Sequence, residues 1–167
     1  MAVSHVANSD TFKVTTPSER EIVLTRLFDA PARLVFEAMT RPEHVRRWWG
    51  ILDDKHSVSR CEIDLRPGGA WHFVGHGPQG EYGFHGVYRE ITPPNRLVYT
   101  EIFDPYPDVE SVVTQILTEE NGKTRMTVKC LYPSVEVRDM VIGTGMEKGA
   151  AISYDRLEEV AKELDRR

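Results

Sequence analysis

The sequence has little cysteine: Cys61 and Cys130 are the only two among 167 residues. Each lies in a segment in which apolar and polar residues alternate, as they do in a half-buried strand. Disulfides belong mainly to exported proteins, and no export signal is evident here. We therefore expect two buried, reduced thiols.

Long apolar runs and blocks of basic residues are also missing. Apolar runs of only a few residues exclude a membrane-spanning helix. A net charge of −5 without a basic block argues against nucleic acid as a partner. The first residues lack the basic start and apolar centre of a secretion signal, so we expect a cytoplasmic protein.

The motifs of nucleophilic and phosphate chemistry are absent as well. The sequence contains no G-x-S-x-G elbow, no P-loop, and no G-x-G-x-x-G between a strand and a helix. His72 and His76 are four residues apart, but a strand and a turn separate them, and the other histidines form no obvious cluster. We therefore expect no cofactor, no metal and no residue that can be assigned a catalytic role.

One long helical pattern stands near the C-terminal end of the sequence. Apolar or small residues recur at spacings of three and four, which places them on one stripe of a helix: Met146, Ala150, Ser153, Leu157, Val160 and Leu164. The second half of this stripe is large and apolar, whereas the first half is small or flexible. This predicts a helix that packs tightly at one end and leaves room at the other. Thr144 and Glu147 have the spacing of a capping box.

Most of the remaining chain predicts strands. Residues 21–28 form the first, two short helices follow over 31–39 and 40–50, and six more strands extend from Ser57 to Tyr132. Short breaks between these strands favour one antiparallel meander. The fold class is α+β, with the helices on one face of a seven-stranded sheet. We expect residues 1–18 to form a flexible arm and residues 19–167 a single domain.

Several segments, in order, resemble the START-like (SRPBCC) superfamily, in the branch of homologues of the activator of the Hsp90 ATPase. They are FDAPARLVFEAMTRPEHVRRWWG, DLRPGGAWHF, GVYREITPPNRLVYTE and the final GMEKG…SYDRLEEVAKEL. The resemblance covers residues 19–164. It implies a helix-grip (Bet v 1-like) fold, in which a curved antiparallel sheet encloses an elongated apolar cavity against the C-terminal helix.

Such a cavity implies binding of a small hydrophobic or amphipathic ligand, although the same aromatic side chains can simply fill a core. Large apolar groups with a few polar tips suit such a site. The candidate wall residues are Trp48, Trp49, Trp71, Phe73, Phe84, Tyr88, Tyr99, Glu101, Phe103, Met146, Ala150 and Ser153. If Glu101 faces inward, its proton affinity rises unless it meets a cation, for which Arg26 is the candidate.

Two other functions remain open. Relatives in the superfamily include polyketide cyclases and aromatases, which orient a reactive substrate and need no nucleophile. For an enzyme of this kind, Glu101, Tyr99 and His85 are the residues to consider. The third reading is an interaction module in chaperone or stress pathways. The eukaryotic activator's separate chaperone-binding domain has no counterpart in these residues, so a chaperone partner stays an alternative and not the favoured expectation. The oligomeric state is open, a homodimer included.

Overall fold

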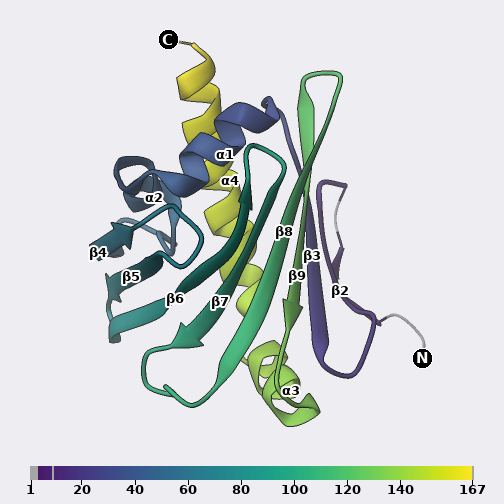
Figure 1. The fold of residues 1–167 in the computed structure, drawn as a ribbon, viewed down its shortest axis with the longest axis vertical. Coiled ribbons are helices and arrows are strands. Elements are labelled where there is room, and N and C mark those ends of the chain that lie inside the picture. Colours follow the sequence, from purple (N-terminus) through teal and green to yellow (C-terminus); the bar gives the residue numbers. More distant parts are fainter. Residues whose placement is uncertain (1–3, 9, 167) are drawn as a thin grey trace.

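The structure, a computed structural model, describes residues 4–8 and 10–166, which form one sheet and four helices (Figure 1). The strands are β1 (Ser4–Asn8), β2 (Phe12–Thr16), β3 (Glu21–Phe28), β4 (Ser57–Ile63), β5 (Ala70–Gly77), β6 (Gly80–Thr92), β7 (Arg96–Phe103), β8 (Glu110–Glu120) and β9 (Lys123–Leu131). The helices are α1 (Ala32–Thr40), α2 (Pro42–Trp48), α3 (Val135–Gly143) and α4 (Met146–Asp165). None of these helices is long and apolar enough to cross a membrane.

The sheet is antiparallel throughout, in the order β1-β2-β3-β9-β8-β7-β6-β5-β4. Strands β4 to β9 form the predicted meander, and β3 closes it by pairing along its whole length with β9. The alternation of buried and partly exposed residues along β3, β8 and β9 is the period-two pattern read from the sequence. The expected α+β helix-grip architecture is thereby confirmed; the seven expected strands, β3 to β9, are contiguous in a sheet that has nine among the described residues.

Residues 1–18, expected to be a flexible arm, contain two further strands instead. Phe12 of β2 pairs with Arg26 of β3, and Val14 pairs with Leu24. The side chains of Phe12 and Val14 are both buried. The alternation in β2 spans too few residues to stand out in the sequence, and the pairing with β3 is what makes this segment a strand. Residues 1–3 and 9 lie outside the described residues.

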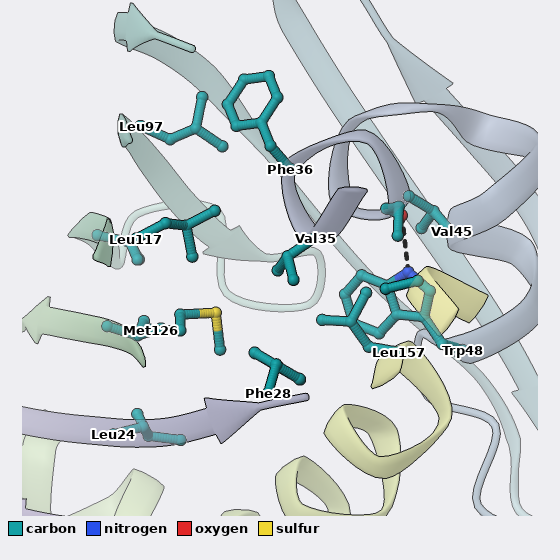
Figure 2. Close-up of a cluster of buried hydrophobic side chains, with 14 of the residues drawn as sticks. Leu24, Phe28, Val35, Phe36, Val45, Trp48, Leu97, Leu117, Met126 and Leu157 are labelled. Carbon is teal, nitrogen blue, oxygen red and sulfur yellow. Dashed lines mark hydrogen bonds between the residues drawn. The ribbon is translucent and has the colours of Figure 1, made fainter. Parts of the chain in front are cut away.

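Helix α4 crosses one face of the sheet (Figure 1). The buried residues of its C-terminal half, Leu157, Val160, Ala161 and Leu164, belong to the main core. Leu157 is fully buried among residues of α1, α2 and the inner face of the sheet (Figure 2). Its surroundings include Phe28, Val35 and Trp48. Burying one such side chain stabilises the fold by about 1.5–3 kcal/mol. Cys61 and Cys130 are also buried, and both are free thiols as expected.

The start of α4 differs from the expected capping box. Thr144 has an α-helical backbone at the end of α3, and its hydroxyl donates to the Val141 carbonyl oxygen. Gly145, with φ of 74°, stands at the N-cap of α4. Since a left-handed residue between two helices favours glycine, Gly145 rather than a Thr144–Glu147 pair sets the turn. The Oε2 atom of Glu147 is buried without a hydrogen-bond partner among the described residues.

Candidate functional site

The predicted aromatic residues of β5, β6 and β7 meet on the face of the sheet that α4 covers. Phe73 pairs with Phe84 across β5 and β6, and Tyr88 pairs with Tyr99 across β6 and β7. The ring of Trp71 lies 5.0 Å from that of Phe73 and 5.6 Å from that of Tyr99. Phe84 and Phe103 are likewise 5.0 Å apart. The register of three hairpins therefore joins residues that are far apart in sequence into one aromatic cluster.

The two adjacent tryptophans at the end of α2 have different surroundings. Trp48 is buried, and its indole N–H donates to the Ala38 carbonyl oxygen over 2.9 Å, within the main core (Figure 2). Trp49 instead contacts the sheet aromatics edge-on, 5.5 Å from Phe73 and 5.9 Å from Phe84. The structure thus joins Trp49 to the aromatic cluster and places Trp48 with the core residues.

Tyr82 belongs to this cluster and was not predicted. Its ring lies 5.9 Å from that of Trp49, and its hydroxyl donates to the Gly50 carbonyl oxygen over 2.7 Å. Gly75, its cross-strand partner, provides the space: a Cβ atom there would lie 2.4 Å from the Tyr82 ring. A glycine opposite an aromatic in a predicted hairpin was the available signal, but it depends on knowing the register.

The first half of α4 is less buried than the second, as the stripe predicts. Met146 and Ala150 are only partly buried where they pack against the core, whereas Leu157 is fully buried. Ser153 is buried, and its hydroxyl accepts a hydrogen bond of 3.2 Å from the Gly50 backbone N–H. This contact joins α4 to the segment that carries Trp49. Tyr154, a further residue not predicted, packs edge-on against Phe12 and Phe28.

Glu101 lies on the same inner face, between Tyr99 and Phe103 along β7. Burial raises the pKa of its carboxyl from 4.5 to about 7. Its carboxylate has no hydrogen-bond or ion-pair partner among the described residues. Burial is also the main cause of the raised pKa values of Tyr99 and Tyr154, and the proximity of Glu101 raises both further. The site therefore contains one acid in a largely apolar, phenolic surrounding.

The expected ion pair between Glu101 and Arg26 is not formed. The Arg26 guanidinium donates instead to Asp155 over 2.8 Å and to Glu158 over 3.2 Å, both on α4. The sequence does not decide whether Arg26 points inward from β3. In the structure it does, and its side chain lies beneath α4 within reach of two carboxylates.

Two open depressions, of about 540 and 550 Å³, lie on the opposite, outer face of the sheet. His72 and Asp104 line both of them, and His85 lines the second. These residues alternate with Trp71 and Phe73 along the strands, so they point away from α4. His85 is consequently remote from the face that carries Glu101 and Tyr99.

A curved antiparallel sheet around a long C-terminal helix, with two short helices after the first central strand, defines a START-like protein of the helix-grip type. The chain belongs to the family described as Activator of Hsp90 ATPase homolog 1-like protein, whose sequence pattern matches residues 29–162. This confirms the resemblance seen in the sequence. No curated protein matches the chain.

Solved structures share the fold. A Rhodobacter sphaeroides protein superposes with a TM-score of 0.82 at 24% identity, covering 92% of this chain and 99% of that one. A Nitrosomonas europaea protein gives a TM-score of 0.76 at 25% identity, covering 91% and 100% of the two chains. A Mycobacterium smegmatis protein gives 0.76 at 24% identity, covering 96% and 95%. At such identities the likeness concerns the fold.

Proposed function

We propose that this protein binds a small hydrophobic or amphipathic molecule between β5–β7 and the first half of α4. The observation that carries the proposal is Glu101, a half-buried acid in an aromatic surrounding, whose carboxylate has no hydrogen-bond or ion-pair partner among the described residues. Partial removal from water already disfavours the charged carboxylate, and a ligand that covers it completely must offer it a hydrogen bond. A ligand with an apolar body and a hydroxyl or amine donor supplies that partner.

Trp71, Phe73 and Tyr88 are buried in the core, but the partial burial of other side chains around them supports the same location. Trp49, Phe84 and Tyr99 face inward yet are not fully buried, and the same is true of Met146 and Ala150 on the helix. The opposite half of α4 shows no such accessibility at Leu157 or Val160. A ligand that covers these aromatic surfaces gains about 25 cal/mol for each Å² of apolar area removed from water.

The chemistry of binding follows from these groups. The aromatic rings desolvate the apolar body of the ligand, and offset or edge-on ring contacts orient an aromatic ligand. Glu101 accepts a hydrogen bond from the ligand's donor, and the Tyr99 hydroxyl is available two residues away. With its raised pKa, Glu101 is partly protonated near neutral pH, so it also donates to a ligand carbonyl.

The first test combines native mass spectrometry of freshly purified protein with titration of tryptophan fluorescence by a panel of aromatic and lipid molecules. We expect one equivalent of a panel member to bind and to change the Trp49 emission. An Ala150→Trp variant fills the proposed space and should weaken binding at least about tenfold, a loss of about 1.4 kcal/mol.

The matched control is Ile152→Trp, because Ile152 is on the same helix but is 37% exposed. This variant should bind as tightly as the unmodified protein. The proposal fails if no panel member gives saturable binding, or if the two tryptophan variants weaken binding equally while both remain folded by circular dichroism.

Glu101 also favours a second candidate function, that of a cyclase- or aromatase-like enzyme. A carboxyl with a pKa of about 7 is suited to proton abstraction at neutral pH, in particular next to a ligand carbonyl. In D₂O, the unmodified protein should then exchange the acidic C–H protons of a bound diketone. Glu101→Gln should stop the exchange without abolishing binding. Binding without any exchange would leave the ligand-binding function alone.

A further inference from the structure

The outer face of the sheet carries a cluster of two histidines and an aspartate from three neighbouring strands or their ends. His72 of β5 pairs directly with His85 of β6, and their rings are 5.6 Å apart. Asp104 follows β7, and its backbone N–H donates to the Gly83 carbonyl oxygen over 2.9 Å. This bond holds the residue after β7 against β6, so the Asp104 side chain lies beside the two imidazole rings.

Asp104 contacts both histidines at once. One carboxylate oxygen, Oδ2, lies 2.9 Å from His72 Nε2, and the other, Oδ1, lies 2.6 Å from His85 Nδ1. The candidate ligand atoms of the three residues all lie within 4.8 Å of one another. Ligand atoms around a tetrahedral Zn²⁺ ion are roughly 3.3 Å apart, given bonds of about 2.0–2.1 Å. Small side-chain rotations therefore bring these atoms to coordinating distances.

Gly83 provides the space in which the carboxylate lies. A Cβ atom at this position would be 2.1 Å from Asp104 Oδ2 and 3.2 Å from a methyl group of Val74. Any other residue at position 83 thus pushes the carboxylate away from the histidines. The arrangement depends on a strand glycine directly beneath it.

Stability alone does not account for this cluster. The side chains of His72, His85 and Asp104 are 28%, 39% and 34% exposed, and ion pairs at such positions contribute little. Two imidazoles and a carboxylate are, however, a common donor set for Zn²⁺ and related divalent ions. Their partial exposure gives an ion an entry path and leaves a further coordination position open to solvent.

The charges around the cluster also suit a cation. The two depressions beside it are lined by the carboxylates of Glu62, Glu81 and Glu110 and by one guanidinium, that of Arg60. Arg60 is in turn ion-paired with Glu62. Glu110 is likewise ion-paired, with Arg89. With Asp104 included, four carboxylates face two guanidiniums, so the charge around the cluster is negative on balance.

We propose that His72, His85 and Asp104 form a binding site for a divalent transition-metal ion, with Zn²⁺ the best-suited occupant. The sequence offered only His72 and His76 as a candidate pair and predicted no metal site; His76 is exposed and pairs across the hairpin with Glu81. The register of β5, β6 and β7 instead selects His85 and Asp104. Because the metal site is on the face opposite the proposed ligand site, the test of one proposal does not decide the other.

The test uses the full chain without a polyhistidine tag, stripped with a chelator and titrated with ZnCl₂ by isothermal calorimetry. We expect one equivalent to bind. His72→Ala, His85→Ala and Asp104→Asn should each weaken binding by at least about 100-fold, because loss of a ligand costs no less than loss of a group that only orients one, which costs about 10–100-fold. His76→Ala is the matched control on the same strand and should bind as the unmodified protein does. Gly83→Ala removes no ligand but should weaken binding by displacing Asp104.

Cobalt gives a second readout, because bound Co²⁺ absorbs visible light according to its ligands. The unmodified protein and His76→Ala should give the same spectrum, and His85→Ala a different or absent one. Circular dichroism of the metal-free variants establishes that each is folded, and His72→Gln replaces His72→Ala if the latter is not. Absence of saturable binding at micromolar Zn²⁺, or binding that survives both Asp104→Asn and His85→Ala, overturns the proposal.

Discussion

The Arg26 guanidinium donates a hydrogen bond of 2.8 Å to the Asp155 carboxylate, which joins β3 to α4. Arg26 is only 4% exposed, and the side chain of Asp155 is 72% exposed. Glu158, the second partner, is less exposed, and it also accepts a hydrogen bond from the Asp29 backbone N–H. The ion-pair cluster therefore consists of one buried guanidinium and two carboxylates that reach it from the surface of α4.

This asymmetry predicts which side of the ion pair is costly to remove. In an Asp155→Asn/Glu158→Gln double variant, the buried guanidinium loses its counter-charges, and we expect a loss of about 3 kcal/mol in the free energy of unfolding. Arg26→Met removes the buried charge itself and should cost about 1 kcal/mol or less. Urea denaturation measures both. A larger loss for Arg26→Met than for the double variant would contradict this account.

Glu101 should make stability depend on pH. Because its pKa is about 7 in the folded protein and 4.5 as the ordinary value, the folded state holds the proton more tightly than the unfolded state. The contribution of Glu101 is therefore most favourable below pH 4.5 and is lost as the pH rises through 7. The full difference is about 3 kcal/mol at most.

Glu101→Gln removes this titration and keeps the shape of the side chain. We expect the variant to gain stability relative to the unmodified protein at pH 8, and to gain much less at pH 5. Urea denaturation of both proteins at the two pH values gives the comparison. An equal effect of the substitution at pH 5 and pH 8 would show that Glu101 does not titrate in this range.

The two thiols should be unreactive in the folded protein. Burial raises the pKa of Cys61 to about 11 and that of Cys130 to about 12. Since the thiolate is the nucleophile, iodoacetamide at pH 8 should modify neither residue in the native state and both in denaturant. Mass spectrometry counts the added groups. Rapid alkylation of either cysteine without denaturant would be inconsistent with this burial.

The contact between Ser153 and Gly50 should stabilise the attachment of α4 to the end of α2. Ser153→Ala leaves the Gly50 N–H without its acceptor, and we expect a loss of about 1 kcal/mol. This corresponds to a fall in Tm of about 2–4 °C for a chain of this size. The exposed Ser57 provides a matched control, and Ser57→Ala should leave Tm unchanged. Equal shifts in the two variants would argue against a specific role for Ser153.

The sequence was sufficient for much of the framework. Alternation identified β3 to β9, and the spacing of Leu157, Val160 and Leu164 identified the packed half of α4, because both patterns are local consequences of backbone geometry. Strands β1 and β2 were missed because the alternation at Phe12 and Val14 is short. The Thr144–Glu147 capping box failed because α3 extends to Gly143 and a left-handed Gly145 makes the turn.

Alternation tells which residues share a face of a strand, but not which residues of other strands lie beside them. Strand register and the placement of α4 decide that, and both are properties of the assembled sheet. The sequence therefore determined the fold, the family and the aromatic character of the inner face. Only the tertiary structure decided that Arg26 pairs with carboxylates of α4 and that Glu101 has no partner among the described residues. It also decided that His72, His85 and Asp104 lie together beside Gly83.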